Sequence, residues 1–77
     1  MTRTLRVYVN ATGIDVSEGA TALDCVRAWR AEEAEAVSDG RHVITDSRGL
    51  PIATDSVAEA GSIYRIVANR RPGQRVD

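Results

Sequence analysis

The start of the chain alternates between apolar and polar residues. Leu5, Val7 and Val9 are expected to point to one side of the run TLRVYVN. Arg6 and Tyr8 are expected to point to the other side. A period of two predicts a β-strand with one buried face. The stretch NATG supplies turn residues and the run IDV alternates again, so the two runs predict an antiparallel hairpin.

The next segment, SEGATALDCVRAWR, changes to a helical period. Thr21 precedes the apolar positions and Asp24 follows three residues later, which predicts an N-cap with a capping box. The apolar residues then fall in one arc of a helical wheel, so we expect a helix that lies on the sheet. The residues of that arc are Ala22, Leu23, Cys25, Val26 and Trp29.

The second half of the chain predicts shorter elements. AEEAEAVSDG favours a second helical piece that Asp39 and Gly40 end. HVITD predicts a third strand, and LPIA a short fourth strand at a sheet edge, because proline lacks a ladder donor. The connection TDSVAEAGS is expected to bury Val57 and Ala60. The nearly continuous apolar run IYRIVA predicts a central last strand covered on both faces.

This order of elements predicts an α+β domain over residues 1–68, followed by a flexible tail over residues 69–77. We expect a mixed sheet of four to five strands with one main helix packed across it. The first and last strands should lie side by side at the centre of the sheet. This is the layout of the β-grasp, or ubiquitin-like, fold.

Composition narrows the class of function. The formal net charge of −1 on 77 residues argues against a nucleic-acid binder, which needs excess positive charge to neutralise phosphates. All basic residues are arginine, so nothing can be attached through a lysine, and such a composition is typical of a GC-rich genome. The chain has no apolar run near ~18 residues and no signal-peptide block. We therefore expect a cytoplasmic monomer, bacterial in origin, without membrane contact.

The candidate reactive side chains do not form a recognisable catalytic motif. Cys25 lies on the apolar arc, which predicts a buried and inert thiol in a reducing compartment. His42 has no Cys or Ser partner, so a surface or strand-start position is expected. Glu32, Glu33 and Glu35 match no metal-site spacing and predict a solvated helix face. We predict no catalytic residue, no metal, no cofactor and no enzymatic activity.

The stretch VYVNATGIDVSEGATALDCVRA resembles the start of the ubiquitin-like sulfur carriers of thiamine and molybdopterin synthesis. It is also similar to the small TGS domains of some synthetases and GTPases, and to bacterial ubiquitin-like proteins. The shared device is the motif EGAT followed by Asp24, which opens the helix. The later stretch GLPIATDSVAEAGSIYRIV resembles the closing segment of the same families. The resemblance covers about residues 4–68 and implies the β-grasp fold.

In these families the function lies in a C-terminal Gly-Gly, whose carboxylate an activating enzyme adenylates. This chain ends in NRRPGQRVD, where Gly73 is the sole glycine. The resemblance therefore implies a precursor that a peptidase trims to Gly73, giving a protein modifier or sulfur carrier. Its protein partners would then be an adenylating enzyme and the processing peptidase. Glycine suits such a tail because it threads narrow channels without a Cβ atom.

Two alternatives remain open. The first is a non-covalent protein–protein interaction module of the same fold, with a passive tail. The second is a TGS-like accessory that associates with a nucleotide or RNA. For protein binding the expected anchors are Arg6 and Tyr8 on the sheet, with Arg70 and Arg71 in the tail, because Tyr and Arg are favoured at interfaces. Further candidates for the exposed face of the sheet are Ile44 and Tyr64.

Overall fold

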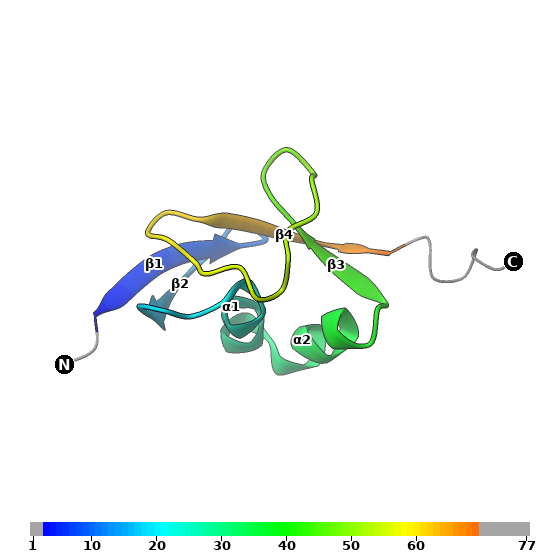
Figure 1. The fold of residues 1–77 in the computed structure, drawn as a ribbon, viewed down its shortest axis with the longest axis horizontal. Helices are drawn as coiled ribbons and strands as arrows, with labels where there is room; N and C mark the ends of the chain where they lie inside the picture. The colour runs from blue at the N-terminus through cyan, green and yellow to red at the C-terminus, as the bar shows by residue number, and fades with distance from the viewer. Residues whose placement is uncertain (1–2, 70–77) are drawn as a thin grey trace, which may run out of the picture.

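A computed structural model describes residues 3–69, which form a mixed four-stranded sheet with both helices on one side (Figure 1). The strands are β1 (Thr4–Val9), β2 (Thr12–Ser17), β3 (His42–Thr45) and β4 (Ile63–Ala68). The helices are α1 (Ala22–Trp29) and α2 (Ala31–Ser38). The predicted α+β class is therefore confirmed. Both predicted helical segments and the first, second, third and last predicted strands are present.

The strands lie in the order β2-β1-β4-β3. β1 pairs with β2, and β3 with β4, in antiparallel fashion, whereas the central pair β1 and β4 is parallel. In that central pair Tyr8 lies opposite Ile63, and Val9 lies opposite Tyr64. The prediction that the first and last strands meet at the centre of the sheet is confirmed.

A two-residue turn joins β1 to β2. Asn10 and Ala11 both have positive φ, at 49° and 69°, which is the type I′ geometry that matches the twist of a hairpin. Asn tolerates this region well, whereas Ala11 adopts it at a cost of roughly 1–2 kcal/mol. The side-chain Oδ1 of Asn10 accepts a 2.9 Å hydrogen bond from the main-chain N–H of Ile66. The turn is thereby fixed to the neighbouring strand β4.

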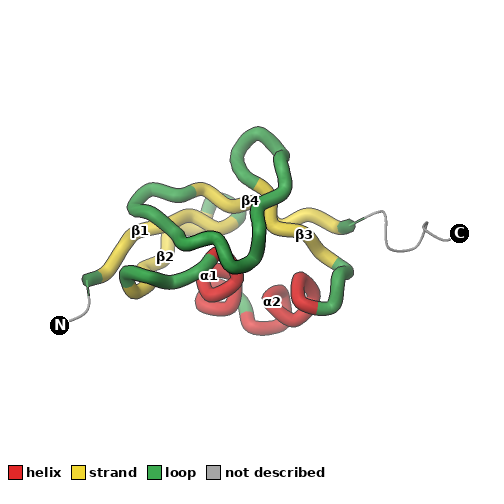
Figure 2. Tube along the Cα trace, viewed as in Figure 1, coloured by secondary structure: helices red, strands yellow, loops and turns green. Residues whose placement is uncertain are grey.

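The start of α1 satisfies its main-chain donors in two ways. The Oγ1 of Thr21 accepts from the N–H of Asp24 at 3.1 Å, and Oδ2 of Asp24 accepts from the N–H of Thr21 at 3.0 Å. The predicted capping box is therefore confirmed. The N–H groups of Ala22 and Leu23 donate to carbonyls of the long loop between β3 and β4, which runs past the start of α1 (Figure 2). Helix and loop thus hold each other in place.

The core lies between the helices and the inner face of the sheet, which is the face that carries them. Cys25 and Val26 of α1 are fully buried there, as the predicted apolar arc requires. The buried residues of α2 are Ala34, Ala36 and Val37. The other buried apolar residues of the cluster are Val7, Val9, Val16, Ala22, Ile44, Ala58 and Tyr64.

The predicted fourth strand is wrong. The stretch LPIA forms a single isolated bridge, between Thr45 and Pro51, rather than a strand. The reason lies in the preceding turn, where Oδ1 of Asp46 accepts from the N–H groups of Arg48 and Leu50 at 2.8 and 3.0 Å. This turn is tight, and the chain then leaves β3 to cap α1.

Two burial predictions are also wrong. Helices cover β4 on one face only, because α1 and α2, the helices of residues 3–69, both lie on the same side of the sheet (Figure 1). In the loop before β4, Val57 is 61% exposed and Ala60 is exposed, whereas Ala58 is buried. The N–H of Ala58 donates to the carbonyl of Ala20 at 2.8 Å, which turns the Ala58 side chain into the core.

Candidate functional site

The most distinctive surface is the uncovered side of the sheet, here called the outer face. It carries Arg6 and Tyr8 from β1, and Ile63, Arg65 and Val67 from β4. Tyr8, Ile63 and Val67 are 39%, 48% and 46% exposed. Large apolar side chains grouped on one exposed face often mark a surface that binds another protein. Because Tyr8 and Ile63 are direct neighbours in register, their side chains form the centre of this surface.

A shallow groove of about 640 Å³ lies on the outer face. One wall comes from the turn after β3, which rises on the side away from the helices (Figure 1). The groove has apolar sides and a single charged residue, the cation of Arg65. Its lining residues are Tyr8, Asn10, Ala11, Ser47, Ile63 and Arg65.

The two arginines of the outer face differ in their electrostatic state. The Nε of Arg6 donates to Oδ1 of Asp15 at 2.7 Å, which raises the pKa of the guanidinium above its ordinary value. Arg65, by contrast, has no ion pair within residues 3–69. The charge of Arg65 is therefore the one that a ligand of the groove can neutralise.

The structure sorts the predicted interface residues. Arg6 and Tyr8 lie on the outer face, as expected, and their role in binding stays a prediction. Ile44 and Tyr64 were wrongly expected there: they are 1% and 4% exposed and belong to the core. Arg70, Arg71 and Gly73 lie outside the described residues.

Sequence reasoning missed Ile63, Arg65 and Val67 as members of the outer face. The run IYRIVA shows little contrast between its two faces. The pairing of the first and last strands at the centre of the sheet was a usable signal. Val9 is buried on the inner face and lies opposite Tyr64 in the register, so the Tyr64 side chain points to the inner face as well. The alternate residues of β4 then belong to the outer face.

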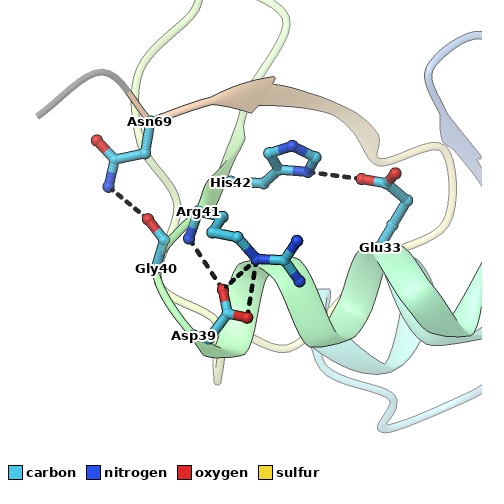
Figure 3. Close-up of polar contacts among 6 residues, drawn as sticks. All are labelled: Glu33, Asp39, Gly40, Arg41, His42 and Asn69. Atoms are coloured by element: carbon cyan, nitrogen blue, oxygen red, sulfur yellow. Dashed lines mark hydrogen bonds and ion pairs between the residues drawn. The ribbon is translucent and has the colours of Figure 1, made fainter. Parts of the chain in front are cut away.

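The end of β4 is anchored where the tail begins (Figure 3). The N–H of Asn69 donates to the carbonyl of Arg41 at 2.9 Å, and its Nδ2 donates to the carbonyl of Gly40 at 3.1 Å. Asp39 braces the same turn: the main-chain N–H of Arg41 donates to its Oδ1, which lowers the pKa of the carboxyl. Gly40 has φ of 90°, a conformation that suits glycine. The last described residue is thus fixed to a rigid turn between α2 and β3.

His42 lies beside this turn and pairs with a carboxylate (Figure 3). Its Nδ1 is 2.7 Å from Oε1 of Glu33, which connects β3 to α2. The expected strand-start position of His42 is confirmed. Glu33, expected on a solvated helix face, is instead partly buried and hydrogen-bonded, because the helix face that carries it turns toward β3.

Reactive chemistry is sparse among the described residues. Cys25 is fully buried, and burial raises the pKa of its thiol, which disfavours the nucleophilic thiolate. No group of three or more His, Cys, Asp or Glu side chains within residues 3–69 is placed to hold a metal ion. Neither α1 nor α2, the helices of this part of the chain, has the length and apolar composition to cross a membrane.

One strand connects the outer face with the anchored end of β4. β4 supplies three side chains of the outer face and ends at Ala68, one residue before the anchored Asn69. The chain matches no family model, no curated protein and no solved structure.

Proposed function

We propose that the domain is a β-grasp, ubiquitin-like fold. Four observations support this class. The sheet order is β2-β1-β4-β3, the central pair is parallel, and each central strand has an antiparallel neighbour outside it. The principal helix, α1, follows the first hairpin and packs across the inner face.

We propose further that the protein is a ubiquitin-like modifier or sulfur carrier that acts through its C-terminal tail after trimming to Gly73. The observation that carries this proposal is the continuity of β4. The same strand exposes Ile63, Arg65 and Val67 on the outer face and then leads directly from Asn69 into the tail. A partner that docks on the outer face is therefore in position to receive the tail.

The tail is short enough to limit where the partner's reaction can occur. Gly73 is the fourth residue after the anchored Asn69. A fully extended chain of that length spans at most about 14 Å. A partner that adenylates the Gly73 carboxylate, with ATP as co-reactant and pyrophosphate as leaving group, must hold its active site within that distance of Asn69.

The groove indicates the chemistry of the docking partner. Its sides are apolar, and its cation, Arg65, has no ion pair within residues 3–69, so the complementary partner surface carries an apolar side chain beside a carboxylate. Truncation of Tyr8 or Ile63 to Ala should then weaken docking, as expected for an exposed apolar anchor. Glu35→Ala, on the helical side of the molecule, is the matched control.

The intact mass of the protein recovered from its native host tests the function. A species that ends at Gly73, with or without a mass increment for sulfur or a conjugate, is the expected result. A stable chain that keeps Asp77 would contradict the proposal. The variant Gly73→Glu should lose processing and activity while the domain keeps its unfolding midpoint, since residue 73 lies beyond the strand.

A second candidate is a non-covalent binding module, favoured by the same uncovered outer face. The two functions separate on removal of the tail. Deletion of residues 70–77 leaves partner binding intact in a pure binding module, but abolishes the product in a carrier or modifier. Tyr8→Ala weakens both.

A further inference from the structure

A second surface lies at the edge of β2, where Asp15 pairs with Arg6 of the outer face at 2.7 Å. We propose that this edge binds an extended peptide with basic side chains, which adds to the sheet as a fifth strand. Main-chain hydrogen bonds would supply the affinity in this mode of recognition, and neighbouring pockets the side-chain preference. The proposal does not depend on the tail or on the function proposed for it.

Hydrogen bonding on the other side of β1 shows which groups of β2 are free. Within residues 3–69, the main chains of Arg6, Tyr8 and Asn10 bond toward β4: the carbonyl of Arg6 accepts from Gly61 at 2.8 Å, and the N–H groups of Tyr8 and Asn10 donate at 2.9 Å. Successive residues of a strand turn their main-chain groups to opposite sides. The alternate residues of β1 therefore bond to β2.

The register then assigns the outward groups of β2. The residues of β2 that lie opposite these alternate residues of β1 direct their main-chain N–H and C=O groups toward β1. They are Thr12, Ile14 and Val16. Gly13, Asp15 and Ser17 turn their main chains outward, and these groups are here called the β2 edge. No main-chain N–H of the β2 edge has a hydrogen-bond partner within the described part of the chain.

The opposite edge of the sheet is already covered. The carbonyl of Ile44 in β3 accepts from the N–H of Ile52 at 2.9 Å, and Thr45 makes a bridge to Pro51. The N–H of Asp46 donates to the carbonyl of Leu50 at 2.9 Å. Of the two edges in the described residues, β2 is thus the one that offers unpaired main-chain N–H groups, at Gly13, Asp15 and Ser17, while the carbonyl of Ser17 accepts from the N–H of Ala20 at 3.0 Å.

A groove of about 520 Å³ runs beside the β2 edge, between that strand and α1. Its charged lining residues are Asp15, Glu18 and Asp24, and no basic residue lines it. Asp15 and Asp24 each pair with an exposed arginine, whereas Glu18 has no ion pair within residues 3–69. Ala20 and Ala28 leave space in the groove for the side chains of an added strand.

Charge also argues against a second copy of this chain as the occupant. Asp15 lies at the middle of the outward groups, so symmetric antiparallel pairing centred there would place two carboxylates opposite each other. Like charges directly opposite in a sheet are destabilising. An arginine or lysine at the same position would instead share the Asp15 carboxylate with Arg6, and Glu18 nearby has no ion pair within residues 3–69, which favours a basic peptide.

The test uses a capped peptide of about seven alternating arginine and valine residues, long enough to cover one strand. Amide chemical shifts of the full-length protein are followed by NMR during titration. Ser17→Pro removes one outward N–H without changing charge and keeps the ladder to β1, because proline is tolerated at a strand edge. Asp15→Asn removes the central charge alone. Glu35→Gln, an exposed acid on α2, is the charge-matched control.

We expect the largest shift changes at Gly13, Asp15 and Ser17. The dissociation constant should rise about tenfold in Ser17→Pro and about threefold in Asp15→Asn, and stay within about twofold in Glu35→Gln. An alternating glutamate and valine peptide should bind at least tenfold more weakly. The proposal is overturned if the basic peptide does not bind at about 1 mM. It is equally overturned if its shifts map to the outer face, or if folded Ser17→Pro binds it as the native protein does.

Discussion

Removal of the Thr21 hydroxyl tests how the start of α1 is held. Three donors of the first turn are satisfied in different ways: Ala22 and Leu23 donate to the carbonyls of Ser56 and Thr54, whereas Asp24 donates to Oγ1 of Thr21. Thr21→Ala therefore leaves one main-chain donor without its protein partner. The two donors that bond to the loop are unaffected, because their acceptors are backbone carbonyls.

The expected cost follows from where that donor lies. The Thr21–Asp24 contact is exposed, so water can replace the lost acceptor, and the full penalty of a buried unpaired group does not apply. N-cap substitutions by Ala cost about 1 kcal/mol in comparable helices. For a domain of this size that loss lowers the Tm by roughly 4–8 °C.

Urea denaturation followed by the fluorescence of Trp29, which ends α1, measures the effect. Thr21→Ser keeps the acceptor and should lose only a small part of the free energy of unfolding. Thr54→Ala keeps its main-chain carbonyl and should unfold at the native midpoint. If Thr21→Ala and Thr21→Ser unfold alike, or if Thr21→Ala costs less than ~0.3 kcal/mol, the loop carbonyls alone hold the helix and our account of the cap is wrong.

Three further predictions concern the same domain. Ala11→Gly should raise the free energy of unfolding by about 1 kcal/mol in urea denaturation, because glycine adopts φ of 69° without strain. Cys25 should resist alkylation in the folded protein at pH 8 and react fully in urea, as its burial and raised pKa require; rapid labelling of the folded protein would contradict its place in the core. The main-chain hydrogen bond from Leu50 lowers the pKa of Asp46, so this carboxylate stabilises the fold above its unfolded pKa of about 3.9, and the gain is lost as pH falls through the folded value. Asp46→Asn should therefore lose less stability than the native protein between pH 5 and about pH 2 in urea titrations.

The first half of the fold was predictable because local signals there agree with the tertiary structure. The alternation through Val7 and Val9 set the buried face of β1, and the pair Thr21 and Asp24 set the first turn of α1. In both cases the residues that fix the element are neighbours along the chain. Propensity, period and capping therefore give the same answer.

The second half was less predictable because its conformation depends on distant contacts. LPIA has strand-forming residues. However, the N–H of Leu50 donates to Oδ1 of Asp46, and the carbonyl of Thr54, just after this stretch, accepts from the N–H of Leu23 at the start of α1. Val57 is exposed and Ala58 is buried, although Val57 is the larger and more apolar residue. The hydrogen bond from the N–H of Ala58 to the carbonyl of Ala20 decides which of the two side chains faces the core. Hydrophobicity alone does not carry that information.

The candidate site shows the same division. Tyr8 was placed on the exposed side by its period-two pattern, but Ile63 and Val67 have no polar neighbours that distinguish them from Tyr64. Their side is set by the parallel register with β1, a contact between the two ends of the chain. The groove formed with Ser47 depends on yet another remote segment.

The outer face and the β2 edge are both consequences of a four-stranded sheet that carries helices on one side. A single helical layer leaves one sheet face in contact with solvent, and there the apolar side chains of β4 remain exposed. An open sheet also has two edges, and within residues 3–69 the chain after β3 bonds to one of them while the outward N–H groups of β2 have no partner. Because β4 is central, it pairs with both β1 and β3. The hydrogen bonds of Asn69 hold the chain just after its end. A ligand on the outer face and one on the β2 edge would therefore contact neighbouring strands of one sheet, and the ion pair between Arg6 and Asp15 links the two surfaces.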